Sequence, residues 1–352
     1  MAKTLACSGG YGSILRRDRQ PLFVAGFRKL RMLAIFLKTT SIFLLIFTGY
    51  LVRRRGLVDE TFNRQLSLLL MNVFYPALIL YSVVRNYTLA SLAGNWMLPV
   101  GSALIMVIGW LVGRLALSGL RQEPENLRRT FHFGCAINNY SFLPIMLVAG
   151  LWGEKAVAQV IFSSLGAELC IWTLGVQALT GHSFSRQALK NFLSMPIIAL
   201  TLAIGVVIAR SLLTPSGSIS LNPPAIPDQV GQAIMSTSQM LGQAAIPVSA
   251  IVCGCRMASL QTDHLFTRPI FLMVFWRLLV IPALAVALLL QLPMPDETLR
   301  VLLVIAVQPV ALVSVTLSEI YRTDARFAAA SVLATHLVCM ATIPVWLHLL
   351  IR

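Results

Sequence analysis

Apolar stretches long enough to cross a bilayer recur along the whole chain, at intervals of roughly 30 residues. An α-helix needs about 20 apolar residues to span the hydrocarbon core. The pattern therefore predicts an all-α membrane protein with ten transmembrane helices. Their cores are expected at residues 35–51, 66–84, 97–117, 130–151, 156–179, 192–213, 230–258, 269–290, 299–318 and 328–350.

The composition agrees with this pattern. Of the 352 residues, 57% are hydrophobic and 12% are charged, whereas a soluble domain has about 25% charged residues. The net charge of +15 would suit a nucleic-acid partner, but basic residues in a membrane protein serve first as cytoplasmic anchors. We expect the lipid bilayer as a partner and no nucleic acid.

Basic residues are distributed unequally between the connections. Those after the odd-numbered spans hold 14 arginines and lysines, and those after the even-numbered spans hold four. The positive-inside rule then places the odd connections in the cytoplasm. With ten spans, both termini face the outside.

The segment ahead of the first span contradicts this orientation, because it carries eight basic residues between Lys3 and Lys38. We expect that 1–31 is an N-terminal extension from a mis-assigned start codon, since Met32 opens a sequence that already begins the first span. The alternative is a basic, acid-poor targeting segment.

Two halves of five spans resemble each other. Pro76 in the second span corresponds to Pro247 in the seventh, and we assign both a structural role. Pro144 in the fourth span corresponds to Pro309 in the ninth, each beside carboxamide side chains. Because five is odd, the second copy must lie inverted in the membrane. The expected units are an inverted repeat at 32–180 and its copy at 181–352.

Proline removes a backbone donor and clashes with the preceding turn, so the fourth and ninth helices are expected to break before Pro144 and Pro309. Irregular backbone inside a bilayer survives only when it is buried in protein or lines a wet cavity. Half-helix ends offer N–H groups to an anion and carbonyls to a cation. The alternative is that the prolines are ordinary kinks and the amides hold helices together. The candidate substrate-binding residues are Asn138, Asn139, Tyr140, Ser141, Pro144, Gln308, Pro309 and Arg277.

Three of the ionisable residues inside the predicted spans are candidates for function. Glu168 could carry a coupling proton or help to hold a cation, or its hydrogen bonds could simply fix the fifth span. Arg277 could attract an anionic substrate if it faces inward, whereas the alternative is snorkelling to the cytoplasmic interface. His336 is a candidate proton carrier, with helix packing as the alternative.

Several motifs resemble one known family: GYLVRRRGLVD at 49–59, FYPALIL in the second span, NNYSFLPIMLVAGLWGEKA at 138–156, QMLGQAAIPVSAIVCGCRMA in the seventh span and VQPVALVSVTLSEIYRTDARFAAASVL at 307–333. In order and spacing they resemble the auxin efflux carrier family, which includes plant auxin carriers and bacterial malonate and malate permeases. The resemblance implies a five-plus-five inverted repeat with crossed, broken fourth and ninth helices. It also implies alternating-access transport of small organic anions.

Some positions depart from the family pattern. Tyr140 to Leu143 replace the glycine that many members have between the asparagine and the proline of the fourth span. Gln308 stands where a small residue or methionine is frequent. The long central loop of plant carriers is missing, because only 182–190 connect the fifth and sixth spans. The resemblance therefore indicates a bacterial-type member in the inner membrane.

These observations predict a secondary active transporter for a small carboxylate, coupled to H⁺ or Na⁺. A channel or a ligand sensor without active transport is the alternative. An intramembrane enzyme is disfavoured, because HExxH, GxSxG and GxGD motifs are missing. The cysteines form no CxxC pair, so we expect no metal and no cofactor. Small-residue helix faces would permit a homodimer.

Overall fold

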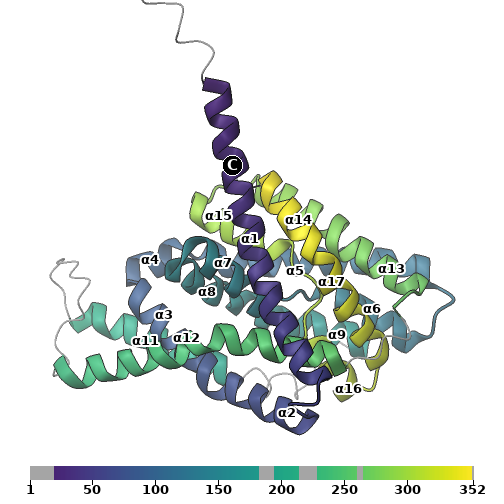
Figure 1. The fold of residues 1–352 in the computed structure, drawn as a ribbon, viewed down its shortest axis with the longest axis horizontal. Helices are drawn as coiled ribbons and strands as arrows, with labels where there is room; N and C mark the ends of the chain where they lie inside the picture. Colours follow the sequence, from purple (N-terminus) through teal and green to yellow (C-terminus); the bar gives the residue numbers. More distant parts are fainter. Residues whose placement is uncertain (1–19, 182–193, 214–227, 260–264, 351–352) are drawn as a thin grey trace, which may run out of the picture.

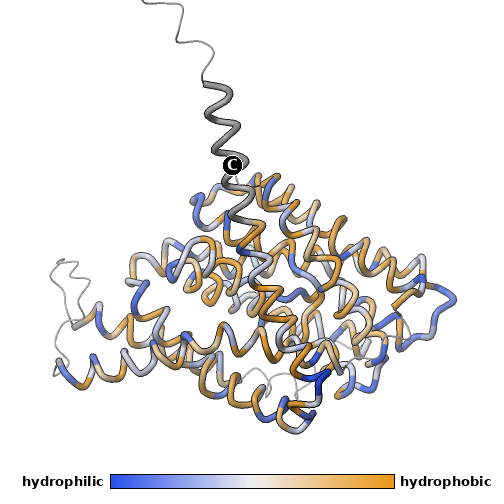
Figure 2. Tube along the Cα trace, viewed as in Figure 1, coloured by the Kyte–Doolittle hydropathy of each residue, from blue (hydrophilic) through white to orange (hydrophobic). Residues whose placement is uncertain are grey.

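The computed structural model describes residues 20–181, 194–213, 228–259 and 265–350. Within these ranges, eight helices are long and apolar enough to cross a membrane. The other two predicted spans, the fourth and the ninth, are each divided into two helices, as described below. This confirms the expected all-α membrane protein, and Figure 2 shows apolar residues along the helices and hydrophilic residues gathered at many helix ends.

The helices follow one another along the chain as Figure 1 shows. In the first half they are α1 (Gln20–Arg54), α2 (Glu60–Leu69), η1 (Leu70–Phe74), α3 (Tyr75–Asn86), α4 (Leu89–Gly94), α5 (Met97–Ala116), η2 (Leu117–Leu120), α6 (Glu125–Ala136), α7 (Phe142–Trp152), α8 (Glu154–Cys170), η3 (Ile171–Gly175) and α9 (Val176–Thr180). In the second half they are α11 (Met195–Leu213), α12 (Asp228–Ser259), α13 (Arg268–Phe275), η4 (Trp276–Val280), α14 (Ile281–Leu289), α15 (Asp296–Ala306), α16 (Val313–Ile320) and α17 (Ala325–Leu350).

Proline shapes several spans without ending them. Pro76 lies in the first turn of α3, directly after the π-helical segment η1, and Pro282 lies in the first turn of α14, directly after the π-helical segment η4. A π-turn shifts the backbone register, which accommodates a residue that has no N–H to donate. Pro247 lies inside the continuous helix α12.

Two groups of helices pack side by side. The first group consists of α1, α2 to α3, α11 and α12, in which α1 packs along α12 and α3 packs against α11 and α12. The second group consists of α5 to α9 and α13 to α17. The groups meet where α3 contacts α8 and where α1 contacts α7 and α17. Each group draws helices from both predicted repeats, and the inverted relation of those repeats stays a prediction.

Glycines allow α1 and α12 to approach at backbone distance. A Cβ on Gly254 would lie 1.8 Å from the carbonyl oxygen of Ile46, and one on Gly49 would lie 2.2 Å from that of Ile251. Small residues permit such contacts in membranes, where dispersion rather than the hydrophobic effect holds helices together.

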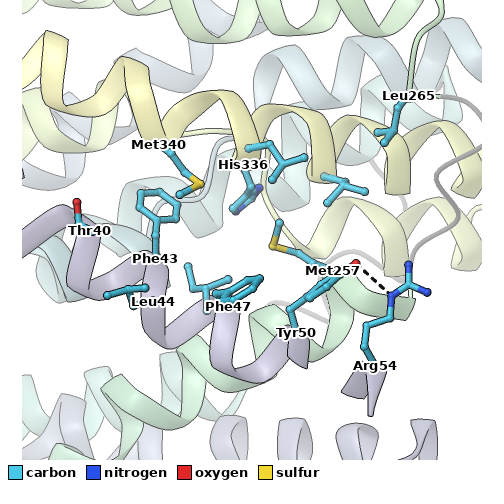
Figure 3. A pocket seen from close by; sticks show the side chains of 13 residues that line it. Thr40, Phe43, Leu44, Phe47, Tyr50, Arg54, Met257, Leu265, His336 and Met340 are labelled. Atoms are coloured by element: carbon cyan, nitrogen blue, oxygen red, sulfur yellow. Dashed lines mark hydrogen bonds between the residues drawn. The ribbon is translucent and has the colours of Figure 1, made fainter. Parts of the chain in front are cut away.

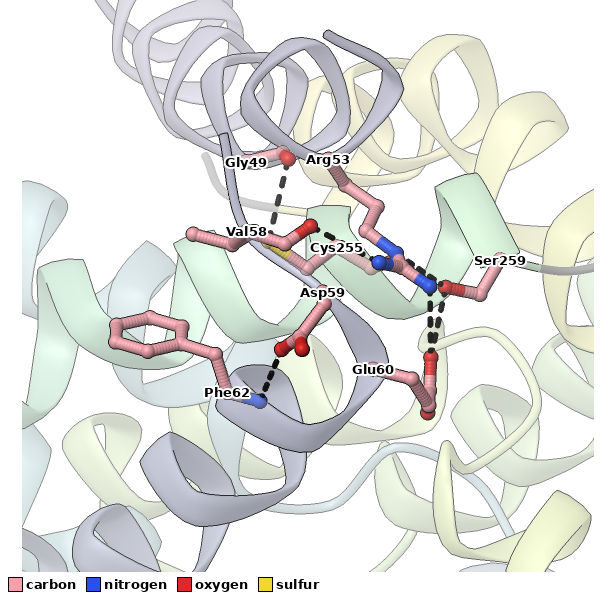
Figure 4. A network of polar contacts seen from close by, with 8 residues as sticks. All are labelled: Gly49, Arg53, Val58, Asp59, Glu60, Phe62, Cys255 and Ser259. Carbon is pink, nitrogen blue, oxygen red and sulfur yellow. Dashed lines mark hydrogen bonds and ion pairs between the residues drawn. The ribbon is translucent and has the colours of Figure 1, made fainter. Parts of the chain in front are cut away.

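A polar network fastens the same two helices to α2 (Figure 4). The guanidinium of Arg53 donates to Val58 O at 2.9 Å and to Ser259 Oγ at 3.1 Å, and it pairs with Glu60 Oε2 at 3.3 Å. Asp59 caps α2 by accepting from the N–H of Phe62 at 2.7 Å. The ends of α1 and α12 are therefore fixed on one face of the molecule.

On that face the connections that follow odd-numbered spans lie together. Arg53 at the end of α1 contacts Ser259 at the end of α12, and the N–H of Asp324 in the α16–α17 turn donates to Thr130 Oγ1 in α6 at 3.1 Å.

The opposite face gathers connections that follow even-numbered spans. Lys155 at the start of α8 pairs with Glu297 at the start of α15 at 2.6 Å, and Arg85 near the end of α3 pairs with Glu154 at 3.7 Å. The charge pattern assigned these two sets of connections to opposite sides of the membrane. Which side is cytoplasmic stays a prediction, and residues 1–19 of the proposed extension 1–31 lie outside the described residues.

Candidate functional site

The fourth and ninth spans are both interrupted, and the interruptions cross each other. α6 ends at Ala136 and α7 begins at Phe142, while α15 ends at Ala306 and α16 begins at Val313. Asn138 and Val310 form an isolated antiparallel bridge between the two extended segments. The N–H of Asn139 donates to Pro309 O at 2.8 Å, and that of Ala311 donates to Ile137 O at 3.2 Å. The helices therefore break before Pro144 and at Pro309, as the prolines predict.

Each of the two buried carboxamides of the crossover forms a hydrogen bond through its nitrogen alone among the described atoms. Asn138 Nδ2 donates to Ile305 O at 2.6 Å, and Gln308 Nε2 donates to Val304 O at 2.7 Å, so both amides satisfy carbonyls in the last turn of α15. The opposite atoms, Asn138 Oδ1 and Gln308 Oε1, are buried without a hydrogen-bond partner among the described atoms. Buried acceptors of this kind cost about 1–3 kcal/mol each unless something else donates to them.

Arg277 joins both arms of the crossover from the π-helical segment η4. Its side chain is 0% exposed, its Nε donates to Gln308 O at 3.1 Å, and its Nη1 donates to Cys135 O at 2.8 Å. The snorkelling alternative is therefore wrong, because the side chain points into the protein. Among the described residues, Nη2 of Arg277 has no hydrogen-bond partner and Arg277 forms no ion pair with a carboxylate.

Glu168 is held by two donors near the crossover. Tyr140 donates its hydroxyl to Oε1 at 2.6 Å, and Trp172 donates Nε1 to Oε2 at 3.2 Å. The contact of Tyr140 links the extended segment after α6 to α8, whereas the contact of Trp172 joins α8 to its own π-helical continuation η3. These hydrogen bonds are of the kind that would fix the fifth span, and they place the carboxylate of Glu168 beside the crossover, so both readings of this residue stay predictions.

His336 contacts the crossover from α17. Its Nδ1 lies 2.8 Å from Val332 O, so this nitrogen carries the proton, because a carbonyl oxygen can only accept. Nε2 then accepts from Asn139 Nδ2 at 3.4 Å. The preceding residue, Thr335, accepts from the N–H of Val310 at 3.3 Å. Sequence reasoning missed Thr335, since a threonine in an apolar span gives no signal of its own.

Neither of the half-helices that begin at the crossover is capped by a side chain at its N-terminus. Ser141 occupies the N-cap position of α7 and Leu312 that of α16, and neither side chain accepts from the first turn. The Ser141 side chain instead lies near the hydroxyl of Tyr75 in α3, a residue that sequence reasoning did not select. Pro144 lies in the first turn of α7, where no intrahelical donor is required.

The structure brings five of the predicted site residues together at the crossover: Asn138, Asn139, Gln308, Pro309 and Arg277. His336 forms a hydrogen bond with Asn139, and Glu168 forms one with Tyr140, the next residue along the chain. Pro76 and Pro247 belong to the other helix group. No group of three His, Cys, Asp or Glu residues suited to a metal ion occurs in the described part of the chain.

Broken helices that meet inside a polytopic helical protein are typical of membrane transport proteins. A family model described as "Membrane transport protein" matches residues 34–197 and 187–347, so the chain belongs to this family, and the resemblance to auxin efflux carriers is confirmed.

Relatives agree with this assignment. An uncharacterized transporter of Methanothermobacter thermautotrophicus is 23% identical over 310 residues, which cover 87% of this chain and 95% of the relative. The uncharacterized transporter MJ1031 of Methanocaldococcus jannaschii is 22% identical over 308 residues, with the same coverage of 87% and 95%. Protein PIN-LIKES 5 of Arabidopsis thaliana is 26% identical over 132 residues, or 34% of this chain and 33% of the relative.

Proposed function

We propose that this transporter is a secondary carrier for a small carboxylate, with the crossover as its binding site. One observation carries the proposal: Arg277 is a fully buried cation without a carboxylate partner among the described residues. Burying a lone charge is costly, and an anion that binds at the crossover offsets that cost.

The remaining features of the site suit the same ligand. Nη2 of Arg277 has no hydrogen-bond partner among the described residues, and the N-termini of α7 and α16, which no side chain caps, favour negative charge. Asn138 Oδ1 and Gln308 Oε1 are free acceptors that would receive a hydroxyl or a water. A carboxylate of few carbon atoms, with or without a hydroxyl group, matches this set of donors and acceptors.

Two titratable side chains are candidates for coupling. Glu168 contacts Tyr140 of the crossover segment, and His336 contacts Asn139, so a proton on either group would alter a hydrogen bond of the site. A sodium ion at the free amide oxygens is the alternative. Alternating access would move the two helix groups relative to each other around the crossover. The proposed location is a bacterial inner membrane with both termini outside.

The test is uptake of radiolabelled mono- and dicarboxylates into proteoliposomes under a proton gradient, a sodium gradient or neither. Asn139→Ala and Gln308→Ala should lower uptake at least tenfold, because each removes a carboxamide of the crossover. Asn63→Ala is the matched control, since Asn63 is 2% exposed in α2 and its Oδ1 is also unpartnered among the described atoms. If both crossover variants transport like the parent, the binding site lies elsewhere, and gradient-independent flux without countertransport would identify a channel.

A further inference from the structure

A long groove of about 460 Å³ lies between α1 and α17, with α12 at its base (Figure 3). It is lined by apolar side chains over most of its length, including Phe43, Phe47 and Met340. Polar groups are found at Thr40 at one end, at His336 on the wall, and at Tyr50 and Arg54 at the other end. The groove therefore combines an apolar channel with one cationic end.

The groove opens onto the lipid-facing side of the helices. Its rim residues Leu44, Phe47, Leu337 and Met340 are 59%, 51%, 51% and 43% exposed. Large apolar side chains with this exposure contact acyl chains when the helices are in a membrane. The occupant of the groove must therefore be apolar along most of its length.

The end of the groove at Arg54 carries a positive charge that no described carboxylate neutralises. Arg54 Nε donates to Tyr50 OH at 3.1 Å, and the guanidinium lies 5.5 Å from the centre of the Tyr50 ring. Neighbouring Arg53 is paired with Glu60, whereas Arg54 forms no ion pair with any described carboxylate. Tyr50 thus holds the guanidinium of Arg54 at the groove through Nε, which leaves the Nη groups of Arg54 to bind a ligand.

We propose that the groove binds an anionic phospholipid, with the phosphate on Arg54 and one acyl chain along the groove. Thr40 and Arg54 are 14 positions apart on α1, or about 21 Å along a helix axis. That length exceeds the roughly 15 Å that one leaflet contributes to the hydrocarbon core, so a complete acyl chain fits. The charge pattern places the end of α1 at the cytoplasmic surface, where anionic lipids attract basic residues.

This lipid would lie at the junction of the two helix groups, because α1 belongs to one and α17 to the other. Its chain would cover His336, which lines the groove and accepts from Asn139 of the crossover. The charged group of this site, Arg54, does not belong to the crossover, and His336 is the residue that the groove shares with the carboxylate proposal.

The experiment measures binding of phosphatidylglycerol to the purified full-length protein by native mass spectrometry, with phosphatidylcholine as the uncharged comparison. The Arg54→Gln variant should bind phosphatidylglycerol about tenfold more weakly, which is the effect of losing one charge-assisted contact. Arg55→Gln is the matched control, because Arg55 is exposed on the same helix end and does not line the groove. It should change the affinity less than twofold.

A second pair of variants tests the acyl chain. Leu337→Trp fills the groove and should also weaken binding, whereas Val338→Trp, one position away and outside the groove, should not. Equal losses for Arg54→Gln and Arg55→Gln would overturn the proposal in favour of diffuse surface attraction. Glycerol phosphate competing as well as the lipid would overturn it in favour of a simple phosphate site, and equal binding of phosphatidylcholine would show an apolar groove that does not select charge.

Discussion

At the scale of single residues, Arg277 has two opposing effects on the stability of the fold. Its hydrogen bonds to Cys135 O and Gln308 O hold the two arms of the crossover together. Its burial without a carboxylate partner among the described residues opposes folding in the absence of an anion. A residue that stabilises the scaffold through its nitrogens and destabilises it through its charge links anion binding to stability.

Arg277→Gln and Arg277→Lys separate these two roles. Glutamine removes the charge, so we expect anion affinity to fall at least tenfold, while lysine keeps the charge and should lose less. Both variants should unfold at lower temperature, because hydrogen bonds from a charged donor contribute about 1.5–3 kcal/mol each. Dissociation constants from anion-induced thermal shifts would measure both effects. Parental affinity in the glutamine variant would reduce Arg277 to a structural brace.

At the scale of helices, backbone contact between α1 and α12 sets how tightly the first helix group packs. Gly254 leaves no space for a Cβ, because Ile46 O lies 1.8 Å from that position. Backbone atoms cannot rotate away from a clash as a side chain can. An added methyl group must therefore separate the two helices.

Gly254→Ala should lower the free energy of unfolding by about 1–3 kcal/mol, the usual cost of overpacking. Gly205→Ala in α11 is the control, because no atom lies within 4 Å of its Cβ position. This control should be neutral or stabilising by up to about 1 kcal/mol, since alanine favours helices. Thermal unfolding in one detergent compares the two, and equal melting temperatures would mean that the α1–α12 contact is looser than described.

Local chemistry was enough to predict the helices and their interruptions. Long apolar stretches predicted the spans, and Pro144, Pro309 and the neighbouring amides predicted the two breaks. Contacts distant in sequence could not be predicted in this way: the Asn138–Val310 bridge and the contacts of Arg277 to both arms depend on how spans pack. The π-helical segments also escaped prediction, because a proline pattern alone does not tell a kink from a shift in register.

At the scale of the whole molecule, we expect the two faces defined by helix-end contacts to lie on opposite sides of the membrane. The described cysteines are all buried. Among the described positions, a polar reagent should therefore label a cysteine added at the surface before it labels any native cysteine. We predict that a cysteine at Glu60 reacts with a membrane-impermeant maleimide only after the cells are opened. A cysteine at Glu297 should react in intact cells. Labelling of both from the same side would contradict the orientation derived from arginine and lysine.

The crossover has a consequence for biosynthesis. Asn138 and its partner Ile305 are 167 residues apart. At about 5–20 residues per second, a ribosome needs roughly 8–35 s to translate the chain between them. During that interval the fourth span is made but its pairing strand is not. Until the ninth span is made, the amide groups of the fourth span therefore lack their final hydrogen-bond partners. Water, the insertion machinery or earlier spans must supply hydrogen bonds to them in the meantime.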